Sequence, residues 1–149
     1  MIKLTIEESH EYEDLKVVVQ CARVDTRLEK LISKIRSYGH CVQGKGEDGG
    51  IRMIPIDEIL YFESVDRKVF LYLKDAVYQS EMSIGEVEKR MKATSFCRVS
   101  KTIVLNLEHL YEVLPLKDRR YQAILSNDER VIVTRGYLAD FKKRFGMAS

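Results

Sequence analysis

Four short apolar segments between residues 51 and 79 constrain the fold more than any other feature of this sequence. They are residues 51–56, 59–64, 68–73 and 76–79. Apolar side chains recur in them with a period of two or in short continuous runs, which is the pattern of β-strands. Only two or three residues separate neighbouring segments, as at Val65-Asp66-Arg67 and Lys74-Asp75. This spacing predicts antiparallel strands joined by tight turns.

Four more strands are predicted in the second half of the chain. They are residues 96–99, 110–115, 121–125 and 130–133. Ser126-Asn127-Asp128 has the composition of a turn and would connect the last two. The chain is therefore predicted to be mainly β.

Two short helices are predicted among these strands. Ser83 and Glu86 have the spacing of a capping box for a helix that ends near Lys92. A closing helix is predicted from about Arg135 to Phe145. Its apolar face would carry Leu138, Phe141 and Phe145, and its solvent face Lys142, Lys143 and Arg144.

The first 45 residues predict a small β-β-α element. Alternating apolar residues at 2–6 and 15–21 predict two strands, and an apolar stripe over 25–36 predicts an amphipathic helix. That stripe consists of Leu28, Leu31, Ile32 and Ile35, and Thr26 with Glu29 would form a capping box. Four glycines within residues 44–50 predict a loop or hairpin tip. We expect two parts, residues 1–45 and 46–149, with the first packing on the second or forming a dimer contact.

Composition narrows the class of protein. Hydrophobic residues make up 45% of the 149 residues, enough for a core, and no apolar run approaches the roughly 20 residues of a membrane span. The first residues lack a secretory signal pattern, so a cytoplasmic location is expected. Three widely spaced cysteines, Cys21, Cys41 and Cys97, predict neither a disulfide framework nor a zinc site and are interpreted as small buried apolar residues.

No catalytic or cofactor constellation stands out. Gly44-x-Gly46-x-x-Gly49 has dinucleotide-binding spacing, but that motif requires a following helix and here a strand is expected. His10, His40 and His109 lie far apart without partners at ligand spacing, and no Gly-x-Ser-x-Gly nucleophile motif is present. We therefore expect no enzyme activity, no metal, no cofactor and no small-molecule substrate.

The charge of the chain is unevenly distributed. The net charge is only +2, yet residues 98–149 contain ten Lys/Arg against six Asp/Glu. A basic final third favours a polyanionic partner such as nucleic acid.

Three stretches, taken together, resemble the LytTR-type DNA-binding domain of bacterial response regulators. Pro55-Ile56-Asp57-Glu58-Ile59-Leu60-Tyr61-Phe62-Glu63 is similar to the opening of that domain. Residues 96–107 resemble its signature Phe-x-Arg-Val-His-Arg-Ser-x-Ile-Val-Asn. Residues 125–137 resemble its Leu-x-Asn-Gly turn and its Val-Ser-Arg-Arg-Tyr close. The resemblance covers about residues 50–146 and implies short antiparallel sheets stacked in a sandwich that read DNA with loops.

The resemblance also implies which residues contact double-stranded DNA. They are Arg98, Ser100, Lys101, Thr102, Asn127, Thr134 and Arg135. Arg and Lys suit phosphates or guanine edges, Asn suits adenine, and Ser or Thr can donate to phosphate. By composition alone, Lys101 and Arg135 are ordinary solvated charges and Asn127 a turn former, and Arg98 is as well suited to pairing with a carboxylate.

The sequence departs from the family at two of these positions. Ser100 replaces a base-reading His, and Gly136 replaces a second Arg. The first 45 residues do not resemble a receiver domain and are too short for one, so phosphorelay control is not expected in this chain. The predicted function is transcriptional regulation by a DNA-binding homodimer. The alternative is a protein-interaction or sensory module that keeps the fold without binding DNA.

Overall fold

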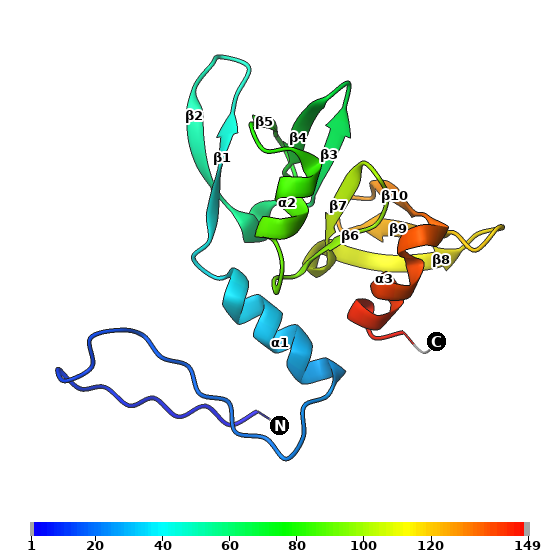
Figure 1. The fold of residues 1–149 in the computed structure, drawn as a ribbon. Coiled ribbons are helices and arrows are strands. Elements are labelled where there is room, and N and C mark those ends of the chain that lie inside the picture. The colour runs from blue at the N-terminus through cyan, green and yellow to red at the C-terminus, as the bar shows by residue number, and fades with distance from the viewer. Residues whose placement is uncertain (1, 148–149) are drawn as a thin grey trace.

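The computed structural model describes residues 2–147 and shows a mainly β fold with two antiparallel sheets (Figure 1). The larger sheet has seven strands in the order β2-β1-β5-β4-β3-β7-β6. In chain order these are β1 (Cys41–Lys45), β2 (Ile51–Pro55), β3 (Tyr61–Val65), β4 (Lys68–Tyr72), β5 (Val77–Ser80), β6 (Phe96–Arg98) and β7 (Ile103–Asn106). The tight turn predicted between β3 and β4 is confirmed, and its residues Asp66 and Arg67 have φ of 50° and 66°.

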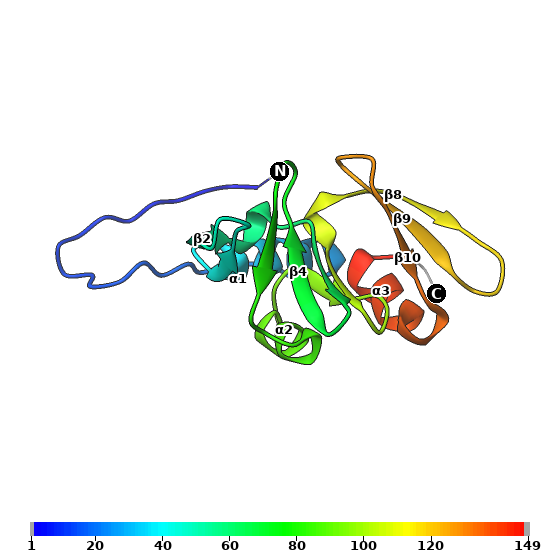
Figure 2. The same cartoon turned by 90° about the horizontal axis from the view of Figure 1, so that it is seen from above.

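The smaller sheet has three strands in the order β10-β9-β8. They are β8 (Leu110–Pro115), β9 (Tyr121–Leu125) and β10 (Arg130–Val133). At one end of this sheet Tyr121 pairs with both Pro115 and Val133. The sheet lies to one side of the seven-stranded sheet, as seen from above in Figure 2.

Three α-helices and three short 3₁₀ turns connect these strands in the described part of the chain. They are α1 (Thr26–Ser37), α2 (Ile84–Arg90), α3 (Leu138–Phe145), η1 (Ile56–Glu58), η2 (Leu107–His109) and η3 (Arg135–Tyr137). The predicted cap of α2 is confirmed, because Ser83 Oγ accepts a hydrogen bond from the Glu86 amide at 3.2 Å. The predicted cap of α1 is wrong by one residue. Asp25 is extended, and its carboxylate accepts from the Leu28 amide at 2.9 Å, so Thr26 is already helical.

Buried side chains form two cores. The first lies between the seven-stranded sheet and α2 and includes Phe62, Leu71, Val87 and Phe96. The second joins the two sheets beneath α3. It consists of Leu60, Cys97, Val99, Leu105, Ala123, Leu125, Val131, Val133 and Phe141. Since β6 contributes Phe96 to one core and Cys97 to the other, the alternating side chains of that strand bind the two halves together.

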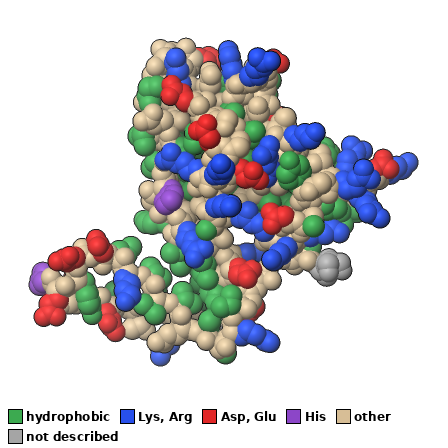
Figure 3. All heavy atoms as spheres, viewed as in Figure 1, with side chains coloured by type: hydrophobic (Ala, Val, Ile, Leu, Met, Phe, Trp, Pro, Cys, Tyr) green, Lys and Arg blue, Asp and Glu red, His purple; other side chains and the backbone are tan. Residues whose placement is uncertain are grey.

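The two strands predicted at residues 2–6 and 15–21 are not formed. Residues 2–24 contain neither strand nor helix and make an extended, fully exposed arm. Figure 1 shows this arm leading away from α1, and Figure 3 shows acidic side chains gathered at its far end. The apolar residues of these two segments alternate as in a strand, but within residues 2–147 no neighbouring strand pairs with them to satisfy their backbone hydrogen bonds.

Helix α1 packs on the end of α3. The Lys30 ammonium lies 5.1 Å from the centroid of the Phe145 ring. Leu28, Leu31 and Ile32 are half-buried, whereas Ile35 is exposed. After α1, strand β1 pairs along its whole length with β2, so this hairpin spans the expected boundary between residues 45 and 46.

Candidate nucleic-acid interface

Two segments that carry predicted DNA contacts meet at one end of the three-stranded sheet. The first is the loop from Val99 to Thr102 between β6 and β7, and the second is the exit of β10 at Thr134 and Arg135. The Thr134 amide donates to the Val99 carbonyl at 2.9 Å, and the Thr134 hydroxyl donates to the same oxygen at 3.3 Å. The fold therefore brings together five of the seven residues predicted from the sequence, namely Ser100, Lys101, Thr102, Thr134 and Arg135.

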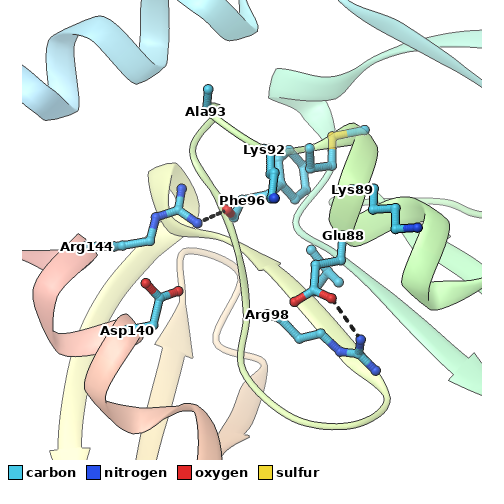
Figure 4. Close-up of a pocket in the computed structure, with 10 residues that line it drawn as sticks. Glu88, Lys89, Lys92, Ala93, Phe96, Arg98, Asp140 and Arg144 are labelled. Carbon is cyan, nitrogen blue, oxygen red and sulfur yellow. Dashed lines mark hydrogen bonds and ion pairs between the residues drawn. The ribbon is translucent and has the colours of Figure 1, made fainter.

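Arg98 fixes the shape of the first segment. Its Nε donates to the Ser100 carbonyl at 3.0 Å, and its Nη2 donates to the Lys101 carbonyl. Nη1 pairs with the Glu88 carboxylate of α2 at 3.0 Å, as Figure 4 shows. The guanidinium also lies 5.8 Å from the ring centroid of Tyr137 in η3. By sequence Arg98 is either a DNA contact or a partner of a carboxylate, and the structure contains the carboxylate pair. The same guanidinium contacts both segments, through the loop carbonyls and Tyr137.

Ser100 is turned inward. Its side chain is buried, and Oγ accepts hydrogen bonds from the amides of Thr102 and Ile103 at 3.2 and 3.1 Å. These bonds satisfy two amides where the loop joins β7 and hold the loop in a tight turn. Ser100, which stands where the family usually has a base-reading His, therefore stabilises the loop from its buried side.

Lys101, Thr102 and Arg135 are exposed at this meeting point, and Thr134 is half-buried. Arg135 begins η3 directly after β10. Because backbone hydrogen bonds anchor both segments, these side chains extend from a fixed platform, which reduces the ordering cost of binding. Two cations and a hydroxyl at one edge can grip phosphates or base edges.

Asn127 lies at the opposite end of the three-stranded sheet. It belongs to the turn between β9 and β10, and its Oδ1 accepts from the Glu129 amide at 3.2 Å. Burial raises the pKa of Tyr61, and the carboxylate of the neighbouring Glu129 raises it further. Asn127 is therefore separated from Arg135 by the length of β10 and cannot share one contact with it.

One cation of α3, Arg144, faces the protein and not the solvent. Arg144 was expected in solvent, but its guanidinium donates to the carbonyls of Thr94 and Phe96. It borders a hollow of about 490 Å³ between α2, β6 and α3 (Figure 4). An arginine can satisfy several carbonyls from one planar group, which explains how a charged residue anchors α3 to β6. Lys143, by contrast, is exposed as predicted.

The three cysteines differ in exposure. Cys97 is buried, and burial raises the pKa of its thiol to about 12. Cys41 is partly buried and Cys21 is exposed, so the interpretation as buried apolar residues holds for Cys97 and is wrong for Cys21. Within residues 2–147 no group of three or more His, Cys, Asp or Glu side chains is arranged to hold a metal ion. No helix in this range is both long and apolar enough to span a membrane.

Known proteins resemble this chain in sequence. "Sensory transduction protein LytT" of Enterococcus faecalis is 29% identical over 105 residues, covering 70% of this chain and 43% of that protein. "Transcriptional regulatory protein LytR" of Staphylococcus aureus is 25% identical over 100 residues, covering 67% of this chain and 41% of that protein. The chain thus aligns with about two fifths of the length of these curated relatives.

A solved structure and a family model agree with these matches. The LytTr DNA-binding domain of a putative methyl-accepting/DNA response regulator from Bacillus cereus superposes with a TM-score of 0.68 at 25% identity. This match covers 72% of this chain and 97% of that domain. The model of the LytTr DNA-binding domain matches residues 49–146, which include both sheets except β1, together with α2 and α3. The chain belongs to the LytTr DNA-binding domain family.

Proposed function

We propose that the chain is a transcriptional regulator that binds specific sites on double-stranded DNA. The observation that carries this proposal is the meeting of the Val99–Thr102 loop with Arg135 at one anchored edge. Arg135 is suited to bidentate contact with a guanine edge, and Lys101 and Thr102 are suited to phosphates. Arg98, Ser100 and Thr134 hold these contacts in place through backbone atoms. We expect this role in the bacterial cytoplasm and without catalysis, metal or cofactor.

Asn127 makes a separate contact in this proposal. Since it lies at the far end of β10, it would reach a different stretch of the duplex from Arg135. Its amide can pair with adenine or donate to phosphate. The two ends of one sheet would then give each copy of the domain an extended footprint.

Arg135 and Lys143 separate base reading from phosphate contact. We expect Arg135→Ala to lower affinity for a selected site by about 1–3 kcal/mol and to relax preference at one base pair. Lys143→Ala should change affinity for selected and scrambled duplexes equally, because an exposed lysine on the outer face of α3 offers only a point charge. The sites come from binding selection with the purified protein, and both variants are titrated at one fixed salt concentration.

The outcome for Arg135→Ala distinguishes three roles. Equal losses on selected and scrambled DNA would make Arg135 a phosphate contact. Unchanged affinity for both duplexes, with an unchanged melting temperature, would show that Arg135 is an ordinary solvated charge that does not contact DNA. Failure of the selection to recover any motif would contradict sequence-specific binding itself and favour the alternative of an interaction module.

We also propose that two copies assemble through the N-terminal arm. Large apolar side chains are exposed along it, among them Leu4 at 82% and Leu15 at 87%. Such a surface favours burial against a partner. Deletion of residues 1–24 leaves α1 and the β1–β2 hairpin intact and is expected to convert a dimer to a monomer in light scattering. Half-site affinity should stay unchanged, while affinity for paired half-sites falls about 100-fold through lost avidity. A full chain that is already monomeric would refute this assembly.

A further inference from the structure

The tip of the β8–β9 hairpin is a basic projection that none of the three family-like stretches includes. Residues 116–120 form this tip, and three of the five are cations: Lys117, Arg119 and Arg120, with Asp118 as the one acid. All five residues are exposed. In Figure 3 Lys and Arg side chains gather at the right-hand edge of the molecule, where Figure 1 places this tip.

The tip has a defined shape. The Leu116 amide donates to the Arg120 carbonyl at 2.8 Å and closes the turn. Asp118 and Arg119 have φ of 61° and 57°, the left-handed conformation that reverses a chain tightly. At its base, Tyr121 is covered by the ammonium of Lys142, which lies 5.1 Å from the ring centroid. The cations are thus carried on a preformed hairpin.

Strand register places the tip beside the candidate interface. Pro115, Tyr121 and Val133 lie in one row across the sheet, and Arg135 follows Val133 by two residues. The tip and Arg135 therefore leave the sheet at the same end, and the two roots of the tip, Tyr121 and Pro115, lie one and two strand spacings from Val133, or about 5 and 10 Å. Figures 1 and 2 both show the yellow tip extending past the orange η3 turn. Asn127, in contrast, lies at the other end.

Within residues 2–147 the tip cations have no acidic partner at ion-pair distance. The one ion pair with an N···O distance within 4 Å among these residues joins Arg98 to Glu88. Three cations held together on one projection repel one another, which favours binding of a multiply charged anion.

We propose that the β8–β9 tip is a second, sequence-independent DNA contact that grips phosphates beside the groove read by Arg135. This inference rests on the proposed DNA-binding function. The major groove is about 12 Å wide, so a hairpin rooted about 5–10 Å from the strand that leads to a residue seated in the groove can reach the bordering phosphate backbone. The tip would fix the orientation of the domain on the duplex and widen its footprint without adding sequence preference.

The test compares two hairpins of the same protein. Arg119→Gln/Arg120→Gln removes two charges from the tip, and Lys45→Gln/Arg52→Gln removes two from the β1–β2 hairpin at the distant edge of the seven-stranded sheet. Both variants are titrated with selected and scrambled duplexes from 50 to 200 mM salt, with melting temperatures and light scattering as checks. The tip variant is expected to bind both duplexes about tenfold more weakly, with a salt slope shallower by about 2. The control variant is expected to keep the wild-type slope.

Any other result would refute either the tip contact, its sequence independence or the proposed function. If the tip variant binds as wild type does while Arg135→Ala still relaxes specificity, the tip contact is wrong and the proposed function stands. A loss confined to the selected duplex would make the tip a base reader and refute sequence independence. A change in molecular mass without a change in half-site affinity would assign the tip to a protein partner. If the wild-type protein itself prefers no duplex and binds none, the proposed function fails together with this contact.

Discussion

Replacing Asn106 by leucine is expected to destabilise the domain by about 3–5 kcal/mol, because four buried or partly buried polar partners lose their hydrogen bonds together. The side chain is fully buried. Its Nδ2 donates to the Ile59 carbonyl at 2.9 Å and to the Ile56 carbonyl at 3.5 Å. Its Oδ1 accepts from the Ser95 hydroxyl at 2.6 Å and the Glu108 amide at 3.0 Å. Leucine has a similar volume, so the loss reports the hydrogen bonds and not a cavity. Thermal melting should fall by roughly 10 °C or more.

Ser95→Ala is the matched control for this change. It removes one of the same hydrogen bonds and leaves Asn106 with its other three partners, so a cost of about 1 kcal/mol is expected. Chemical denaturation of the two variants measures the difference. A cost below about 1 kcal/mol for Asn106→Leu would show that water or local movement satisfies these groups. DNA affinity per folded molecule should remain that of wild type in both variants.

Much of the strand pattern was predictable because period-two alternation has a direct physical cause in a half-buried sheet. Strands β1 and β7 were not predicted, and β1 is the more instructive of the two. It contains Gly44, which suggested a loop, yet a Cβ at this position would lie 2.5 Å from Ile54 and 2.8 Å from Tyr78. Glycine is therefore required here by close packing within a strand. The arm shows the converse, since its alternating residues 2–6 and 15–21 have strand character but no strand to pair with.

The candidate site was predictable in its residue types and only partly in its arrangement. Local sequence places Lys101 in a loop and Arg135 at a helix start, but their meeting is shown by long-range contacts such as the hydrogen bonds between Thr134 and Val99. The inward turn of Ser100 was equally hidden, because a serine in a loop resembles any solvated hydroxyl. The resemblance identified the region, and long-range pairing determined which side chains are free to bind.

Arg98 is expected to control DNA binding without touching a base. Arg98→Lys should lower affinity about 30- to 150-fold, or about 2–3 kcal/mol, because one ammonium cannot hold the Ser100 and Lys101 carbonyls and pair with Glu88 at once. The loop that carries Lys101 would then lose its fixed shape. Hydrogen exchange at the amides of residues 102 and 103 should accelerate in the same variant.

Glu88→Gln separates this positioning role from the ion pair. The Glu88 side chain is 45% exposed, so loss of its charge should cost less than about 1 kcal/mol and leave both affinity and exchange near wild type. If Glu88→Gln matched Arg98→Lys in its loss of affinity, the ion pair and not the two carbonyl contacts would set the loop. If Arg98→Lys kept wild-type affinity and wild-type exchange, the loop would hold its shape through Ser100 and the Thr134 bonds alone. An intermediate loss of affinity with accelerated exchange would still identify the guanidinium as the group that links loop order to DNA binding, since no other side chain bonds to both carbonyls within the described residues.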